Sequence, residues 1–343
     1  MKRIGKWKHM RLPALFLSAA VLSLICAGCK AQKGQNVAVP EFVLTYAENQ
    51  AEDYPTTLGA YRFAELVHER TGGKIEIQVH ADAALGEEQS VISQVQFGGI
   101  DFARTSLSSL AEIIPKLNVL QMPYLYTGSE HMWKVLEGDI GDDFMNSFDG
   151  SNLVPLSWYD AGARNFYNSV HPIEQLEDMQ GMKIRVQESK LMKDTVIALG
   201  AEPVPMAFED VYSALETGEI DGAENNWPSY ESTRHYEVSR YYTIDEHNRI
   251  PEMQVMSQST WEKLKPEYQK IIRECARESA LYERELWVER ERSSEIKVRK
   301  EGCTLTELPP EEKARFQEAV LPMYEKYCSD YMDIIEAIIA VGK

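Results

Sequence analysis

Two arginines and a pair of asparagines stand beside strand-like segments in the second half of the chain. Arg164 lies in WYDAGARNFYNS, Arg185 lies in KIRVQES, and Asn225 and Asn226 lie in IDGAENNW. A guanidinium offers a planar fork of donors that matches a carboxylate, and side-chain amides both donate to and accept from hydroxyl groups. Taken singly, each arginine is equally well explained by a structural ion pair. Together, the four side chains predict a binding site for an organic anion.

The sequence lacks the motifs that would indicate catalysis or metal binding. It has no G-x-S-x-G nucleophile elbow, no glycine-rich phosphate loop and no H-E-x-x-H motif, and its seven histidines are scattered. The segment from Asp245 to His247 (DEH) is too short to define a metal site. The many carboxylates single out no pair for glycoside hydrolysis. We therefore expect a binding protein without catalytic residues, metal or cofactor.

The segments around these side chains alternate between strand and helix patterns. Strand patterns begin at Glu41, Lys74 and Ile100, and amphipathic helix patterns lie between them. The alternation predicts an α/β fold with largely parallel sheets and helices on their faces. After Pro266 a helical pattern continues for roughly thirty residues, which corresponds to about 45 Å and is long enough to cross two lobes.

Short segments of the first half recur in the second half. GGKIEIQV matches GMKIRVQ, and QFGGIDFA matches ETGEIDGAE. Two matches in the same order predict two similar α/β lobes, with a ligand cleft between them at the carboxyl ends of strands. The first match places Glu76 where the second half has Arg185, so the repeated fold does not itself require a cation there.

The first 28 residues are typical of an export signal. MKRIGKWKHMR is basic, and the apolar run LPALFLSAAVLSLICAG that follows is short for a membrane span. Small residues precede Cys29 as in the lipobox of bacterial lipoproteins, although Cys26 stands where an aliphatic residue is usual. We expect a lipoprotein signal peptide over 1–28, a lipid on Cys29 and a linker over 29–36; cleavage without lipidation is the alternative.

The chain is acidic, with 36 basic and 54 acidic residues and a net charge of -18. Loss of the basic signal would make the mature protein still more acidic, which argues against nucleic acid as a partner and against a polybasic attachment to anionic lipid. Apart from Cys26 and Cys29, the chain has three cysteines, namely Cys275, Cys303 and Cys328, and this odd number indicates neither a disulfide framework nor a zinc site.

These segments resemble the solute-binding proteins of tripartite ATP-independent periplasmic (TRAP) transporters, in the family typified by the dicarboxylate-binding subunit. The resemblance runs over almost all of the mature chain. It is most specific in LEDMQGMKIRVQES, ALGAEPVPMAFEDVYSALETGEIDGAENN and ALGEEQSVISQVQFGGIDFAR. It implies two α/β lobes, joined by crossing strands and a long helix, with an organic acid in the cleft. We expect lobe I to comprise 37–161 and about 251–290, and lobe II to comprise 162–250 and about 291–343.

The resemblance also implies which residues face the ligand. Arg185, in the KIRVQ segment, would clamp the carboxylate of the ligand. The other positions that it implies are Arg164, Asn225, Phe208, Asn49 and the region from Arg104 to Ser106.

The finer pattern indicates the type of acid. GAENNWPSYESTRHYEVSRYYTIDEHNRIPE is similar to the branch associated with sugar acids such as glucuronate and galacturonate, whereas dicarboxylate, sialic acid and ectoine branches commonly have proline where Asn226 stands. A second amide beside Asn225 suits a polyhydroxylated acid, because each desolvated hydroxyl needs a partner. Glu88, Asn165 and His247 are further candidate contacts for hydroxyl groups.

We therefore expect a lipid-anchored extracytoplasmic protein, in the periplasm or on the outer face of the cell membrane. It would capture a hexuronate-like acid, close its lobes around it and pass it to a permease driven by an ion gradient. One alternative is a binding protein for a C4-dicarboxylate or keto acid. Two others, from different classes, are a secreted hydrolase of acidic sugars and a purely structural surface lipoprotein.

Overall fold

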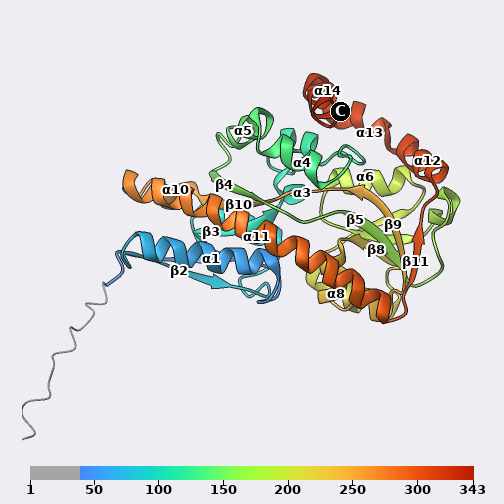
Figure 1. The fold of residues 1–343 in the computed structure, drawn as a ribbon, viewed down its shortest axis with the longest axis horizontal. Helices are drawn as coiled ribbons and strands as arrows, with labels where there is room; N and C mark the ends of the chain where they lie inside the picture. Colours follow the sequence, from blue (N-terminus) through green and yellow to red (C-terminus); the bar gives the residue numbers. More distant parts are fainter. Residues whose placement is uncertain (1–38) are drawn as a thin grey trace, which may run out of the picture. The chain divides into compact units, whose positions relative to one another are not determined.

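Two β-sheets, each covered by helices, form the frame of the protein in the computed structural model (Figure 1). The structure describes residues 39–343. The expected signal peptide, Cys29 and the linker lie outside the described residues. We call the first sheet with its helices the first lobe, and the second sheet with its helices the second lobe.

The first sheet has the strand order β2-β1-β3-β10-β4. Its strands are β1 (Phe42–Ala47), β2 (Ile75–His80), β3 (Phe102–Ser106), β4 (Leu153–Tyr159) and β10 (Glu252–Ser257). β1 runs parallel to β2 and β3, whereas β10 is antiparallel to both β3 and β4.

The second sheet has the strand order β11-β9-β5-β8-β6-β7. Its strands are β5 (Arg164–Asn168), β6 (Lys183–Val186), β7 (Glu202–Pro205), β8 (Gly222–Asn225), β9 (Tyr241–Asn248) and β11 (Thr304–Glu307). β6 is parallel to β7 and β8, and β5 is antiparallel to β8 and β9. Both sheets are therefore mixed rather than largely parallel, because β4 leads directly into β5 and β9 into β10 across the two lobes.

The predicted internal repeat is present, but one of its two matches pairs the wrong strands. Asp101, before β3, accepts a hydrogen bond from the backbone N–H of Thr45 on β1 (2.8 Å), and Asp221, before β8, does the same for Lys183 on β6 (2.8 Å). β3 thus corresponds to β8, as predicted, but β6 corresponds to β1. β2, which carries Glu76, is an edge strand and is not the counterpart of β6.

Helices cover both sheets and fill the connections between strands. In the first lobe they are α1 (Pro55–Arg70), α2 (Glu88–Phe97), α3 (Leu107–Leu110), η1 (Pro115–Gln121), α4 (Ser129–Leu136), α5 (Asp139–Met145) and α10 (Gln258–Trp261). In the second lobe they are η2 (Leu176–Met179), α6 (Lys190–Ala198), η3 (Phe208–Asp210), α7 (Val211–Thr217), α8 (Trp227–Ser232) and α9 (His235–Val238).

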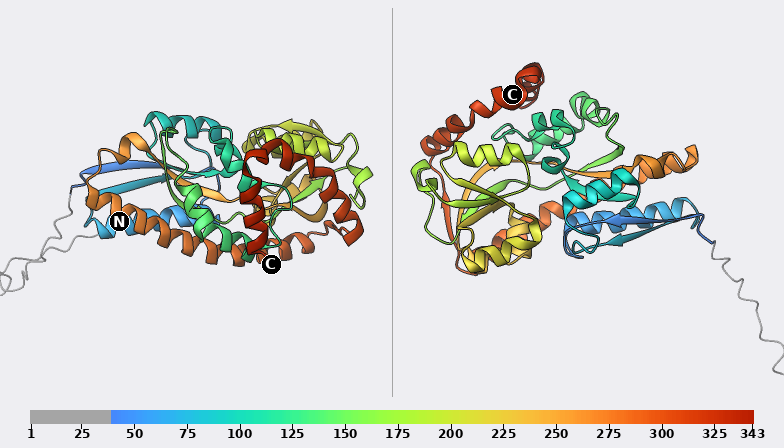
Figure 2. Two further views of the ribbon diagram at one scale, coloured as in Figure 1. Left: turned by 90° about the horizontal axis from the view of Figure 1, so that it is seen from above. Right: turned by 180° about the vertical axis from the view of Figure 1, so that it is seen from behind.

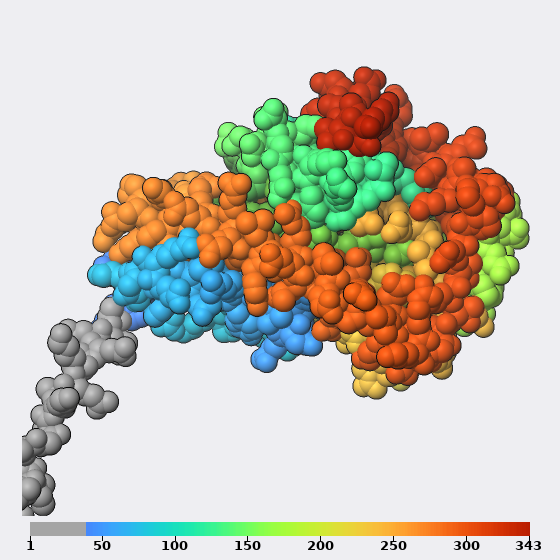
Figure 3. All heavy atoms as spheres, in the orientation of Figure 1, coloured from blue at the N-terminus to red at the C-terminus, as the bar shows by residue number. Residues whose placement is uncertain are grey.

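The predicted long helix is α11 (Pro266–Lys300), which has 35 residues and begins at Pro266. It packs on α1 and β4 of the first lobe and on α8 of the second lobe, so that it spans both (Figures 1 and 3). Its buried positions, among them Ile272, Cys275, Ala276, Glu283 and Trp287, recur at the spacing of one helix face.

The chain ends in helices that pack on both lobes. These helices are α12 (Pro310–Val320), α13 (Pro322–Cys328), η4 (Ser329–Tyr331) and α14 (Met332–Val341). α12 contacts α6 of the second lobe, α13 contacts both α6 and η1, and α14 contacts α4 of the first lobe. Figure 2 shows them, in dark red, arching from one lobe toward the other. Between Val39 and Lys343, every helix is too short or too polar to cross a membrane.

Candidate functional site

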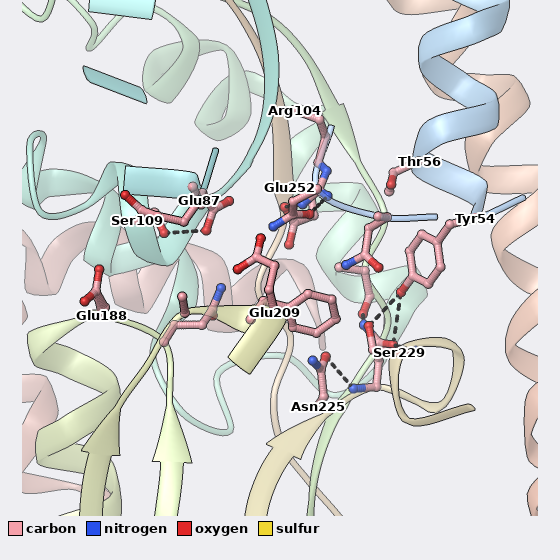
Figure 4. Close-up of a pocket in the computed structure, with 18 of the residues that line it drawn as sticks. Tyr54, Thr56, Glu87, Arg104, Ser109, Glu188, Glu209, Asn225, Ser229 and Glu252 are labelled. Atoms are coloured by element: carbon pink, nitrogen blue, oxygen red, sulfur yellow. Dashed lines mark hydrogen bonds and ion pairs between the residues drawn. The ribbon is translucent and has the colours of Figure 1, made fainter. Parts of the chain in front are cut away.

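Residues from both sheets and from α11 line one cavity (Figure 4). Eight of the ten residues predicted to contact a ligand line it: Asn49, Glu88, Arg104, Arg164, Arg185, Phe208, Asn225 and Asn226. The first lobe contributes the loop after β1, the start of α2 and β3. The second lobe contributes β5, β6, η3, β8 and the start of α8.

Arg164 and Arg104 are buried and already have carboxylate partners. On β5, Arg164 donates from Nε and Nη2 to both carboxylate oxygens of Glu224, the second bond measuring 2.8 Å. On β3, Arg104 donates from Nη1 to Glu252 (2.9 Å) and from Nε to Glu48 (3.1 Å). The charges of these two guanidinium groups are therefore compensated within the protein.

Arg185 is the third buried arginine of residues 39–343, with 3% of its surface exposed. Its Nε and Nη2 donate to the backbone carbonyl of Met206 at 3.0 and 2.7 Å. No carboxylate of the described residues lies within 4.0 Å of it, and burial lowers the pKa of its guanidinium. Because a buried charge without a counter-ion is costly, an anion bound at Arg185 would be strongly favoured.

The strand pattern of KIRVQ places Arg185 in the cavity. Ile184 and Val186 are fully buried in the apolar core on the opposite face of β6, so the alternation predicted from the sequence is confirmed. Arg185 pairs in register with Ala223 on the neighbouring strand β8, and β8 ends at Asn225, which also lines the cavity. At Arg185 the polar face of β6 therefore meets a cavity rather than bulk solvent.

Asn225 and Asn226 both line the cavity but differ in their hydrogen bonds. The Oδ1 atom of Asn225 accepts from the backbone N–H of Asn226 (2.9 Å), and its Nδ2 has no partner within the described residues. Asn226 caps α8, because its Oδ1 accepts from the backbone N–H of Ser229 (2.7 Å), while its Nδ2 donates to the carbonyl of Ala161 (2.9 Å). The amide of Asn225 is thus available to a ligand, whereas that of Asn226 is engaged in the fold.

Glu88 and Asn49 offer acceptor oxygens at the first-lobe wall. The carboxylate of Glu88 accepts from the backbone N–H of Ser106 and from the hydroxyl of Ser109, both at 2.7 Å. The side-chain oxygen of Asn49 accepts from Arg104. These bonds fix the orientation of both side chains without using every lone pair.

Asn165 and His247 do not line the cavity, in contrast to their predicted contact with ligand hydroxyls. The amide of Asn165 accepts from the backbone N–H of Glu246 (2.9 Å) and donates to the carbonyl of Ala163 (3.2 Å). Asn165 is adjacent to Arg164 on a strand, so its side chain leaves the opposite face of the sheet. Of these two neighbours, only Arg164 therefore faces the cavity.

His247 lies behind the cavity wall as a support for an ion pair. Its ring stacks on Phe166 with centroids 4.1 Å apart, its Nδ1 lies 3.0 Å from Asp245, and its Nε2 lies 3.5 Å from the carboxylate of Glu224. Burial opposes protonation, but these two carboxylates raise the pKa of His247 to about 9. Likewise, burial opposes ionisation of Glu224, but Arg164 and His247 lower its pKa to about 2.

Several lining residues were not predicted from the sequence. Glu252 on β10 is one, and burial raises its pKa to about 7 although Arg104 opposes this rise. Others are Gln50, Tyr54, Glu87, Gln187, Glu209, Ser229 and Trp287. Trp287 belongs to the buried stripe of α11, where it is indistinguishable by pattern from a core residue. The single acid Glu252 between apolar residues of a buried strand is the signal that could have been used.

The cavity therefore combines one uncompensated guanidinium with many hydroxyl-binding oxygens and amides. Within residues 39–343, no group of three or more His, Cys, Asp or Glu side chains is arranged to hold a metal ion. The chemistry that the lining supports is recognition of a single carboxylate together with hydroxyl groups.

Known proteins match this chain over most of its length. The family described as bacterial extracellular solute-binding protein, family 7 (DctP), matches residues 46–330. A solute-binding protein of Chromohalobacter salexigens is 33% identical over 95% of each chain. A TRAP periplasmic solute-binding protein of Xanthobacter autotrophicus with bound β-D-galacturonate is 38% identical, with a TM-score of 0.84 over 87% of this chain and 99% of its own. One of Roseobacter denitrificans with bound β-D-glucuronate is 37% identical, with a TM-score of 0.83 over 87% and 98%.

Proposed function

Because the chain belongs to family 7 of the bacterial extracellular solute-binding proteins, we propose that it binds a hexuronate such as glucuronate or galacturonate outside the cytoplasm for uptake by a TRAP permease. Solved relatives with these sugar acids in place support this proposal. Membership of a solute-binding family supports a role in transport rather than catalysis.

One observation carries the proposal: Arg185 is a buried guanidinium that lines the cavity and has no carboxylate partner among residues 39–343. A ligand carboxylate would supply the missing counter-ion and accept charge-assisted hydrogen bonds from the free N–H groups. Arg164, whose charge is compensated by Glu224, would offer the ligand a hydrogen-bond donor rather than net charge.

The count of charges favours one carboxylate over two. Of the three buried arginines in the described chain, only Arg185 lacks a counter-ion, so a dicarboxylate would have to bring its second charge close to acids such as Glu88, Glu209 and Glu252. These same acids are good acceptors for hydroxyl groups. The lining is thus better suited to a polyhydroxylated monoacid than to a C4-dicarboxylate.

We propose further that lobe I (37–161 and about 251–290) and lobe II (162–250 and about 291–343) close around the ligand. The connections from β4 to β5 and from β9 to β10 would act as the hinge. Attachment to the membrane by a lipid on Cys29, after removal of 1–28, would keep the protein near its permease.

A thermal-shift panel tests the function directly. It would compare D-glucuronate, D-galacturonate, gluconate, succinate and glucose on the purified mature protein, since a ligand that binds only the folded state must raise the melting temperature. We expect the two hexuronates to give the largest shifts. Equal stabilisation by glucose would refute recognition of the carboxylate, and stabilisation by succinate alone would favour the dicarboxylate alternative. Chromatography after incubation with a glucuronide or an oligogalacturonide, whose glycosidic bonds can be cleaved, would detect turnover if the protein were a hydrolase.

A further inference from the structure

A buried tyrosine joins the two lobes beside the cavity. Tyr54 belongs to the loop after β1 and stands immediately before α1 in the first lobe. Its hydroxyl lies 2.8 Å from the hydroxyl of Ser229 and donates to Oδ1 of Asn226 (3.3 Å), both at the start of α8 in the second lobe (Figure 4). We call these two hydrogen bonds the Tyr54 contact.

The ring of Tyr54 is held at the point where the lobes are connected. It is 2% exposed and packs edge-on against Trp287 of α11, with centroids 5.8 Å apart and planes at 72°. It also clusters with Ala161, which lies in the connection between β4 and β5. Burial raises the pKa of Tyr54, so its hydroxyl stays protonated and can both donate and accept. The Tyr54 contact is therefore fixed on one side and reaches the second lobe on the other.

The second-lobe end of the contact is linked to the cavity wall. Asn226, which accepts from Tyr54, also donates to the carbonyl of Ala161 and caps α8. Its backbone N–H donates to Oδ1 of Asn225, and this bond leaves Nδ2 of Asn225 to the cavity. Tyr54, Asn225, Asn226 and Ser229 all line the same cavity. Separating the lobes at this point would break the Tyr54 contact and release the constraint on the ligand-facing amide.

We propose that the hydroxyl of Tyr54 is a latch that holds the lobes closed on the bound acid and thereby slows its release. The inference rests on the proposed function, because it concerns the ligand of that same cavity. Tyr54 acts here as a positioning residue, since its hydrogen bonds go to Ser229 and Asn226. This assignment also gives Asn226 a role in closure in place of the predicted contact with ligand hydroxyls.

The variant Tyr54→Phe isolates the latch, because it keeps the ring against Trp287 and removes only the hydroxyl. We expect the dissociation rate of D-glucuronate or D-galacturonate to rise about tenfold, which is the scale of one buried hydrogen bond, while the association rate stays unchanged. Stopped-flow tryptophan fluorescence would measure both rates. Ser229→Ala should raise the dissociation rate less than Tyr54→Phe does, because the bond from Tyr54 to Asn226 remains. The double variant should be no faster than Tyr54→Phe, since the bond between Tyr54 and Ser229 is already absent in that variant.

Tyr212→Phe is the matched control. The Tyr212 hydroxyl bonds to Glu237 within the second lobe (3.4 Å) and makes no bridge between the lobes in the described structure. A dissociation rate in Tyr54→Phe equal to that in Tyr212→Phe would overturn the latch. So would full additivity of Tyr54→Phe and Ser229→Ala.

A readout without ligand separates failure of the latch from failure of the proposed function. Hydrogen–deuterium exchange over residues 225–233 of the ligand-free protein should be faster in Tyr54→Phe than in the wild type, because the latch restrains the start of α8. If the wild type bound neither hexuronate, the proposed ligand would be wrong, and the rate of hydrogen–deuterium exchange alone would test the latch. Faster exchange would then support the latch, and unchanged exchange would overturn it.

Discussion

Replacing Arg185 by methionine should abolish tight binding without harming the fold. Methionine keeps a flexible side chain of similar length but removes the charge that would face the ligand carboxylate. Losing one partner of a buried, hydrogen-bonded charge pair costs about 4 kcal/mol of binding free energy, which raises the dissociation constant roughly a thousandfold. Isothermal titration calorimetry with D-glucuronate would measure the change.

The stability of the ligand-free protein provides the second half of this prediction. Arg185 has no carboxylate partner within residues 39–343, so Arg185→Met removes an uncompensated buried charge and should leave the free energy of unfolding equal to or above that of the wild type. Arg164→Met is the matched control, because Arg164 is equally buried but pairs with Glu224. It would leave the buried carboxylate of Glu224 with only the more distant imidazole of His247 and should cost about 3 kcal/mol in urea unfolding.

Two results would refute this reasoning. Glucuronate binding by Arg185→Met at wild-type affinity would show that Arg185 does not meet the ligand carboxylate. Destabilisation of ligand-free Arg185→Met by as much as Arg164→Met would show that Arg185 has a counter-ion in the protein. Far-ultraviolet circular dichroism of both variants would control for loss of structure.

Three further predictions concern titration and the amides. Burial raises the pKa of Glu252 to about 7, so the favourable contribution of Glu252 to stability is complete below pH 4.5 and is lost as the pH rises through about 7. The difference in urea stability between the wild type and Glu252→Gln should therefore change over that range. A difference that stays constant with pH would contradict this prediction. The imidazole of His247, with a pKa of about 9, should titrate near that value when it is followed by nuclear magnetic resonance. A midpoint at or below 6.5 would show that His247 forms no ion pair with Asp245. Asn225→Ala should weaken hexuronate binding about tenfold without changing the melting temperature, because its amide lines the cavity. Asn165→Ala should lower the melting temperature without changing hexuronate binding, because its amide bonds to the backbone. The reverse pattern would show that the cavity-facing sides of β5 and β8 are misassigned.

Strand and helix patterns in the sequence were sufficient to predict the α/β class and the long helix α11, and the recurring segments predicted the two lobes. These patterns did not give the neighbours of each strand. KIEIQ and KIRVQ have the same pattern, yet β2 is an edge strand and β6 lies between β7 and β8. The period of a strand reports which of its faces are buried, whereas its partners are set by contacts between distant segments. For the same reason the alternation predicted largely parallel sheets, and the antiparallel pairing of β5 with β8 and of β10 with β3 was missed.

The chemistry of the side chains was set by the sequence alone: guanidinium groups to bind an anion, and amides and carboxylates to bind hydroxyl groups. By residue type and position alone, Arg164 and Arg185 were equivalent candidates, and only the family resemblance singled out Arg185 as the clamp. The tertiary structure distinguishes them, because pairing of β5 with β8 brings Glu224 to Arg164 across sixty positions of the chain, while Arg185 meets only a backbone carbonyl among the described residues. Whether a charge is free to bind a ligand depends on the groups within a few ångströms of it, and folding alone brings those groups together.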